Sequence, residues 1–153
     1  MLGVEFVADR GGLLPWQVNR VRTYVDEALN GRIALADAAR QARLSAGYFS
    51  RCFRRSFGLT FSQFVARERI ERALRLMATS PSSLSAIALA CGFADQAHFT
   101  RTFGAVTGST PGRWRRQTIN DALSETLSFD PVSRGSARAG VDRLPREMAP
   151  QYS

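Results

Sequence analysis

The chain has 153 residues, 44% of them apolar, so it can bury one core of ordinary size or two small linked cores, but not several unrelated domains. Its net charge is +8, and all 21 basic residues are arginine, whose forked donors favour a partner that presents phosphates or base edges. No stretch approaches the roughly 18 apolar residues that a membrane span requires, which argues against a membrane partner.

The N-terminal segment, residues 1–14, is interpreted as a short leader without the basic region and cleavage site of a secretory signal. The two cysteines, Cys52 and Cys91, each lie within an apolar helical pattern, which favours buried free thiols over a disulfide framework. Together these observations predict a cytoplasmic protein.

The first predicted unit is a helix-turn-helix over about residues 15–58. Its first helix begins at Pro15, carries apolar residues at helical spacing and ends at Asn30-Gly31. A second helix over about 35–41 leads through a three-residue turn to a third, which opens at Ser45 as N-cap. Two helices joined by so short a turn are typical of this motif.

A long amphipathic linker helix is predicted next, over about residues 61–78. Its 18 residues predict a rod of about 27 Å at 1.5 Å per residue. One turn of B-DNA is about 34 Å, so a groove helix at each end of this rod could reach adjacent major grooves on one face of the duplex. We therefore expect a monomer on an asymmetric DNA site.

A second helix-turn-helix is predicted over about residues 83–116. It has helices over about 84–90 and 95–106, and a short last helix that starts at Thr110-Pro111. Beyond Arg116 the apolar periodicity fades, and residues 117–153 are expected to form a flexible tail. No strand-like alternation occurs, so the predicted class is all-α.

The two units are copies of one another. Phe49-Ser-Arg51-Cys-Phe53 recurs 50 residues later as Phe99-Thr-Arg101-Thr-Phe103, so one supersecondary unit is used twice. Between Arg20 and Arg116, 16 arginines face 6 acidic residues, which places the positive charge in the duplicated region. Two such units indicate two readers of a repeating polymer, and double-stranded DNA is the predicted partner.

Base contacts are expected on the outward faces of the third and sixth helices, because a helix-turn-helix inserts its second helix into the major groove. An arginine can donate two hydrogen bonds to guanine, and a glutamine can pair in the same way with adenine. The predicted base-contacting residues are Gly47, Ser50, Arg51, Gln96, Ala97, Thr100 and Arg101. The alternative for Arg51 and Arg101 is an ion pair within their own lobe that only ties helices together.

Phosphate contacts are expected beside these faces, at Ser45, Tyr48, Arg54, Arg55, His98 and Arg113. Arg54 and Arg55 could instead be merely solvated, and His98 could pack on the flank of a helix. Tyr48 could be a packing aromatic, because readers of duplex DNA rarely stack on bases.

From about Pro15 to Arg116 the sequence resembles the DNA-binding domain of the AraC family of bacterial transcription regulators. The most specific segment is Ala86-Ile-Ala-Leu-Ala-Cys-Gly-Phe93, followed by Gln96, His98-Phe99, Arg101, Phe103, Gly108, Thr110-Pro111 and Trp114-Arg115. The resemblance implies two homeodomain-like helix-turn-helix subdomains joined by a long, rigid linker helix. It also implies activation or repression by contact with RNA polymerase.

The sequence departs from the family pattern in its first turn. Arg43 stands where the second turn has Gly92, and where the family often has glycine. A left-handed backbone at Arg43 would cost about 1–2 kcal/mol, which predicts a looser first lobe. In the second unit, Gly104-Ala105 replaces the pair Arg54-Arg55, which predicts a weaker hold on phosphate.

The sequence leaves alternatives to a complete DNA-binding regulator. The chain could be the DNA-binding fragment of a larger ligand-responsive regulator, or a protein-interaction module that acts on RNA polymerase with little DNA binding. An enzyme is not expected, because His98 is the only histidine and no nucleophile, base or metal-ligand spacing accompanies it. No metal or cofactor is predicted.

Overall fold

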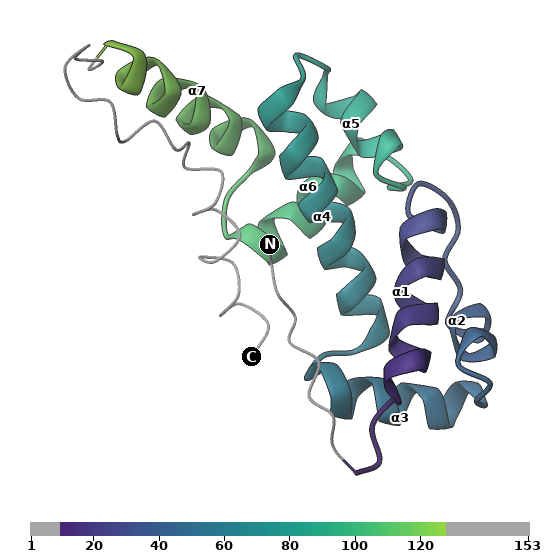
Figure 1. The fold of residues 1–153 in the computed structure, drawn as a ribbon. Helices are drawn as coiled ribbons and strands as arrows, with labels where there is room; N and C mark the ends of the chain where they lie inside the picture. Colours follow the sequence, from purple (N-terminus) through teal and green to yellow (C-terminus); the bar gives the residue numbers. More distant parts are fainter. Residues whose placement is uncertain (1–9, 128–153) are drawn as a thin grey trace.

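The computed structural model describes residues 10–127, and this part of the chain forms seven helices and no strand (Figure 1). The helices are α1 (Pro15–Ala28), α2 (Leu35–Gln41), α3 (Ala46–Phe57), α4 (Phe61–Thr79), α5 (Leu84–Ala90), α6 (Gln96–Thr107) and α7 (Pro111–Leu127). The all-α class and the two helix-turn-helix units on a long linker helix are confirmed.

The helices enclose two hydrophobic cores, and α4 contributes to both. Its first turns supply Phe61, Phe64 and Val65 to the first lobe, which is built with α1, α2 and α3. Its later turns supply Ile70, Ala73, Leu74 and Met77 to the second lobe, which is built with α5, α6 and the start of α7. One uninterrupted helix is therefore part of both cores.

Aromatic rings fill the first core around Phe53, which is fully buried. The ring of Phe57 stacks on that of Phe53 at 4.4 Å, and Phe61 and Phe64 meet it edge-on at 5.4 and 5.3 Å. These residues belong to α3 and α4, so the rings fix the angle at which α3 crosses the linker helix.

The start of α4 is defined by a capping box. The hydroxyl of Thr60 accepts a hydrogen bond from the Gln63 amide at 3.2 Å, and the Gln63 side chain accepts one from the Thr60 amide at 2.9 Å. Just before it, Gly58 ends α3 with a left-handed φ of 73°. Gly108 ends α6 in the same way, with a φ of 74°. The ends of α3 and α6 are thus encoded locally.

The folded part begins before Pro15, which corrects the prediction that residues 1–14 are only a leader. Leu13 is 3% exposed and belongs to the first core. Its amide donates to the hydroxyl of Ser56, itself buried on α3, at 2.7 Å. An apolar side chain and a satisfied buried hydroxyl hold this residue in the fold. Residues 1–9 lie outside the described part of the chain.

The last helix is longer than predicted, because α7 has 17 residues and runs to Leu127 rather than ending near Arg116. Only its first turns are anchored, by the buried residues Pro111 and Trp114. The guanidinium of Arg115 also donates to the Ser82 and Ser80 carbonyls, at 2.7 and 3.1 Å. Residues 117–127 continue this helix and are therefore not the flexible tail that was predicted, whereas residues 128–153 lie outside the described range.

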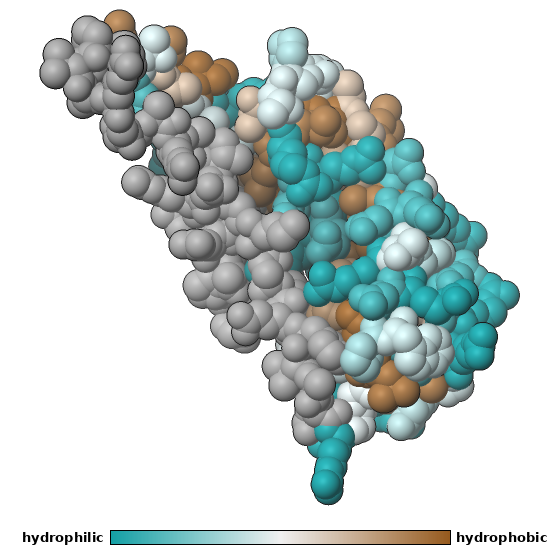
Figure 2. All heavy atoms as spheres, in the orientation of Figure 1, coloured by the Kyte–Doolittle hydropathy of each residue, from teal (hydrophilic) through white to brown (hydrophobic). Residues whose placement is uncertain are grey.

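Apolar side chains show at the surface of the second lobe and along α7 in Figure 2, where Leu89, Ile119 and Leu123 are exposed. Ile119, Leu123 and Leu127 are spaced four residues apart on α7. This spacing is a helical signal in the sequence, although none of the three side chains is buried.

Candidate nucleic-acid interface

The first recognition helix, α3, is anchored by one face and capped at its start. The Ser45 hydroxyl accepts a hydrogen bond from the Tyr48 amide at 3.3 Å, as predicted for an N-cap. Phe49, Cys52 and Phe53 are buried, and the opposite face lies toward solvent. Along that outward face, Gly47, Tyr48, Arg51, Arg54 and Arg55 are exposed and Ser50 is half-buried.

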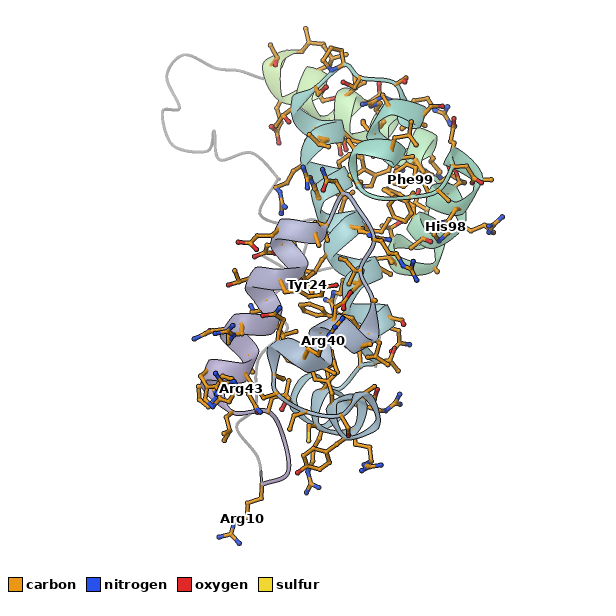
Figure 3. All side chains as sticks on the ribbon, turned by 90° about the vertical axis from the view of Figure 1, so that its right-hand side faces the viewer. Arg10, Tyr24, Arg40, Arg43, His98 and Phe99 are labelled. Atoms are coloured by element: carbon orange, nitrogen blue, oxygen red, sulfur yellow. The ribbon has the colours of Figure 1, made fainter. Side chains whose placement is uncertain are left out.

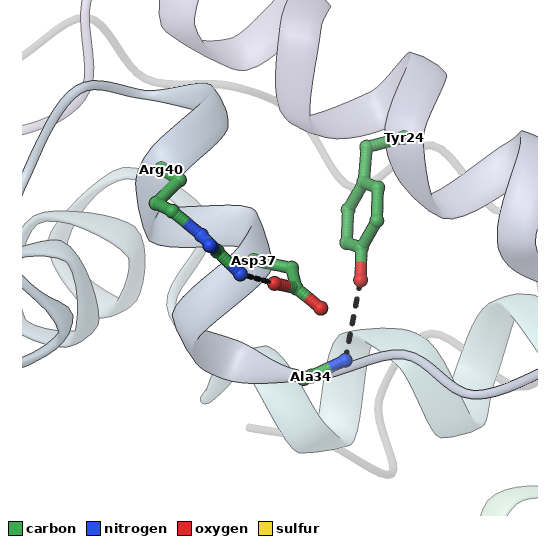
Figure 4. Close-up of polar contacts among 4 residues, drawn as sticks. All are labelled: Tyr24, Ala34, Asp37 and Arg40. Carbon is green, nitrogen blue, oxygen red and sulfur yellow. Dashed lines mark hydrogen bonds and ion pairs between the residues drawn. The ribbon is translucent and has the colours of Figure 1, made fainter.

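The position of α2 before this helix depends on a contact that sequence reasoning missed. Ala34 is the N-cap of α2 and has no capping side chain, and its amide donates instead to the Tyr24 hydroxyl of α1 at 3.2 Å (Figure 4). On α2 itself, Arg40 is paired with Asp37. No periodic signal in the sequence links Tyr24 to Ala34.

The second recognition helix, α6, is built in the same way. The Asp95 carboxylate caps it by accepting a hydrogen bond from the His98 amide at 2.7 Å. Phe99 and Phe103 are buried in the second core, and Gln96, Ala97 and Arg101 are exposed. Thr100 and His98 are half-buried, while Arg113, at the start of α7, is exposed.

His98 packs against the second core and is also partly exposed at the surface. Its ring meets Phe93 edge-on at 5.3 Å, so the prediction that it packs on a helix flank is confirmed. In Figure 3 the side chain projects outward while Phe99 points into the lobe. A phosphate contact by His98 is compatible with this position and stays a prediction.

Arg51 and Arg101 form no ion pair with any residue between positions 10 and 127, so the alternative that they tie helices of their own lobe together is wrong for the described residues. The Arg51 guanidinium lies over the Tyr48 ring at 5.7 Å, on the outward face of α3. Both arginines are exposed and carry donors that a partner could engage.

Two other predicted contact residues already have neighbours in this structure. The Gln96 side-chain oxygen accepts a hydrogen bond from the Ser85 hydroxyl of α5 at 2.5 Å, which orients the amide. The Arg55 guanidinium lies beside Gly11, where a β-carbon would stand 3.1 Å from Nη1. Gln96 is thus pre-oriented, and Arg55 packs against the segment that precedes α1.

In Figure 1, α3 lies at the start of α4, and α6 crosses α4 further along it. The 19 residues of α4 make a rod of about 28 Å. Both helices therefore pack against one continuous helical support.

The remaining chemistry of the described residues does not point to catalysis. Burial raises the pKa of the Cys91 thiol, which is the reverse of an activated cysteine. Between residues 10 and 127 no group of three or more potential metal ligands comes together. No helix in this part is long and apolar enough to cross a membrane.

Comparison with known proteins gives the same picture. Residues 38–117, more than half of the chain, match a family described as a helix-turn-helix domain. The chain is 33% identical over 98 residues to the uncharacterised HTH-type transcriptional regulator YfiF of Bacillus subtilis, covering 64% of this chain and 31% of that protein. It is 32% identical to the transcriptional activator RhaR of Salmonella dublin, over 64% of this chain and 35% of the other. It spans about a third of the length of these relatives.

Solved structures share the fold. A transcriptional regulator of Chromobacterium violaceum, described as an AraC-type DNA-binding domain protein, superposes with a TM-score of 0.62 at 25% identity, over 66% of this chain and 90% of that one. The DNA-binding domain of AdpA, solved in complex with a target DNA, superposes with a TM-score of 0.62 at 25% identity, over 77% of this chain and 98% of the other. The chain belongs to the AraC family of helix-turn-helix transcription regulators.

Proposed function

We propose that this protein is a sequence-specific regulator of transcription that binds double-stranded DNA with α3 and α6 in adjacent major grooves. The observation that carries the proposal is the pair of exposed faces on one supporting helix, each presenting an arginine, Arg51 and Arg101, that forms no ion pair within residues 10–127. The AdpA domain was solved with its target DNA, and its likeness to this chain supports the same use of the fold.

Within this proposal the outward residues divide by position. Arg51 and Arg101 read base edges through two donors each, together with Gln96, whose amide Ser85 orients. Gly47, Ser50, Ala97 and Thr100 lie on the same two faces and complete the base-contacting set. Ser45, Tyr48, Arg54, Arg55, His98 and Arg113 flank them and contact phosphates, which fixes register without reading sequence.

Selection of bound sequences from a random duplex library tests the arrangement. We expect an asymmetric site with two contacts about one helical turn, or roughly 10 base pairs, apart. A protein that acts as a monomer should bind this site with one chain per duplex in analytical ultracentrifugation. A strict inverted repeat that is bound only by a dimer would contradict the proposal.

Substitutions on the two faces separate base reading from phosphate binding. Arg51→Ala and Arg101→Ala should each cost about 1–3 kcal/mol on the selected site and relax the preference at one position. Arg54→Ala should weaken binding to all sequences and lower the salt slope by about one. Arg20→Ala, on an exposed position of α1, is the matched control and should leave both properties unchanged.

A role at the promoter follows from the family and is part of the proposal. RNA polymerase is the proposed protein partner, and the alternative is that this chain is the DNA-binding part of a larger ligand-responsive regulator, since the matched relatives are about twice as long as this chain. If duplex affinity did not depend on salt and none of the arginine variants changed it, a protein-interaction module that hardly touches DNA would be the better description.

A further inference from the structure

The two lobes touch where Arg69, in the middle of α4, reaches the end of α1. The Arg69 Nε donates to the Leu29 carbonyl at 3.3 Å, and Nη2 donates to the Gly31 carbonyl at 2.8 Å. Carbonyl groups at the C-terminal end of a helix lack partners within the helix and lie at the negative end of its dipole. A forked cation therefore bridges α4 and α1 across 40 residues of chain.

The turn between α5 and α6 closes on the same point. A β-carbon on Gly92 would overlap the Leu29 carbonyl oxygen and stand 3.0 Å from Arg69 Nε. The φ of Gly92 is 83°, in the left-handed region. Only a residue without a side chain allows the backbone of this turn to come so close. We call Leu29, Gly31, Arg69 and Gly92 the interlobe clamp.

We propose that the interlobe clamp sets the spacing between the two DNA contacts, and that Arg69 is its positioning residue. The inference rests on the proposed function. It depends on connectivity: α1 packs on α2 in the first helix-turn-helix, and Gly92 lies in the turn that leads directly into α6. The clamp therefore joins the first helix-turn-helix to the turn that begins α6.

Long helices bend, so α4 alone would let the distance and orientation between α3 and α6 vary. The clamp adds a second point of attachment beside α4. One additional base pair between the contacts displaces one of them by about 3.4 Å and rotates it by about 34–36°. A clamped pair of readers cannot follow that displacement, whereas an unclamped pair can follow part of it.

Spacing selectivity is the quantity to measure. The duplex selected by the unmodified protein is altered by inserting or deleting one base pair between its two contacts, and the affinities are compared. We expect the unmodified protein to lose about tenfold or more, and Arg69→Ala about threefold or less. Arg75→Ala removes the same charge from an exposed position of α4 and should keep the unmodified ratio.

Two glycine substitutions separate the effect of the close contact between Gly92 and Leu29 from the effect of backbone strain. Gly92→Ala introduces both the strain of a positive φ and the overlap with Leu29. Gly58→Ala introduces the strain at a φ of 73° with no atom within 4 Å, so it is the matched control. Gly92→Ala should change the spacing preference and Gly58→Ala should not, with circular dichroism showing that both variants are folded.

A measurement without DNA separates the clamp from the proposed function. Spin labels at Ala46→Cys and Ala94→Cys, both exposed, report the distance between the starts of the two recognition helices. We expect a narrow distribution in the otherwise unmodified protein and a broader one with Arg69→Ala. The clamp would be overturned if Arg69→Ala lost affinity equally for duplexes of every spacing and left the distribution of label distances unchanged. A protein that recognises no two-contact duplex, but whose label distances broaden, would overturn the proposed function alone.

Discussion

Arg43 and Gly92 occupy equivalent positions in the two helix-turn-helix turns and share a left-handed backbone, with φ of 57° and 83°. Arg43 is the only residue other than glycine between positions 10 and 127 with a positive φ. Its guanidinium lies over the Trp16 ring at 5.8 Å, a contact worth about 0.5–1 kcal/mol at an exposed site. The cation–π contact thus offsets part of the backbone cost of about 1–2 kcal/mol.

Because of this conformation, glycine at position 43 should give a more stable protein than alanine, which is the reverse of the order within a helix. Arg43→Gly and Arg43→Ala both remove the contact with Trp16, but only alanine retains the left-handed strain, so the glycine variant should be more stable by about 1 kcal/mol. At Arg40, three residues earlier within α2, alanine should be better than glycine by about 1 kcal/mol. Urea denaturation of the four variants measures both differences. The same order at both positions would contradict the assigned conformation.

Most of the architecture could be predicted from the sequence because it is repeated. Ser45 and Gly58 recur as Asp95 and Gly108, and each pair bounds a recognition helix by local capping. Local signals of this kind need no knowledge of distant contacts. The positions of both outward faces followed from the same repeat, because the apolar residues that recur in each copy fix the inward face.

Contacts between distant segments could not be predicted. Arg69 and Leu29 are 40 residues apart, and an arginine on a linker helix gives no periodic sign that its partner is a backbone carbonyl. Gly92 was expected only to permit a turn, whereas its lack of a side chain also permits contact between the lobes. The continuation of α7 to Leu127 was missed although the sequence carries a signal for it, because Ile119, Leu123 and Leu127 recur at a helical spacing of four residues.

Asp95 should limit DNA affinity while it stabilises α6. Its carboxylate caps the helix proposed to enter the groove, and it places a negative charge where phosphates would approach. Asparagine caps a helix about as well as aspartate, so Asp95→Asn should change stability by less than about 1 kcal/mol. Duplex affinity at low salt should rise roughly two- to fivefold, because a repulsive charge is lost.

Two further variants separate the two roles of Asp95. Asp95→Ala should lose about 1 kcal/mol of stability, because the His98 amide loses its acceptor. Glu125→Gln removes an acidic charge from the exposed end of α7 and should leave duplex affinity unchanged. Fluorescence anisotropy with a labelled duplex measures affinity. An Asp95→Asn variant that bound no more tightly than the original would place α6 away from phosphates.

Glu68 makes stability depend on pH near neutrality. Burial raises its pKa from 4.5 to about 7, and the nearby carboxylates of Glu71 and Asp26 add to the shift. The folded state therefore holds a proton between pH 4.5 and 7 that the unfolded state releases, so stability falls as pH rises through this window. Glu68→Gln, which cannot ionise, should match the original protein below about pH 4.5 and exceed it by roughly 1–3 kcal/mol at pH 8.

The origin of this shift can be tested with a second substitution on α4. Glu71→Gln removes a negative charge that raises the pKa of Glu68, so the midpoint of the Glu68 titration, followed by NMR, should move down. Glu71 also pairs with Arg75 at 3.3 Å, and Arg75 is one of the groups that lower the pKa of Glu68. Arg75→Ala should therefore move the midpoint in the opposite direction. If all three proteins titrated Glu68 near pH 4.5, the carboxyl would be solvated in the folded protein and the shift would not arise from burial.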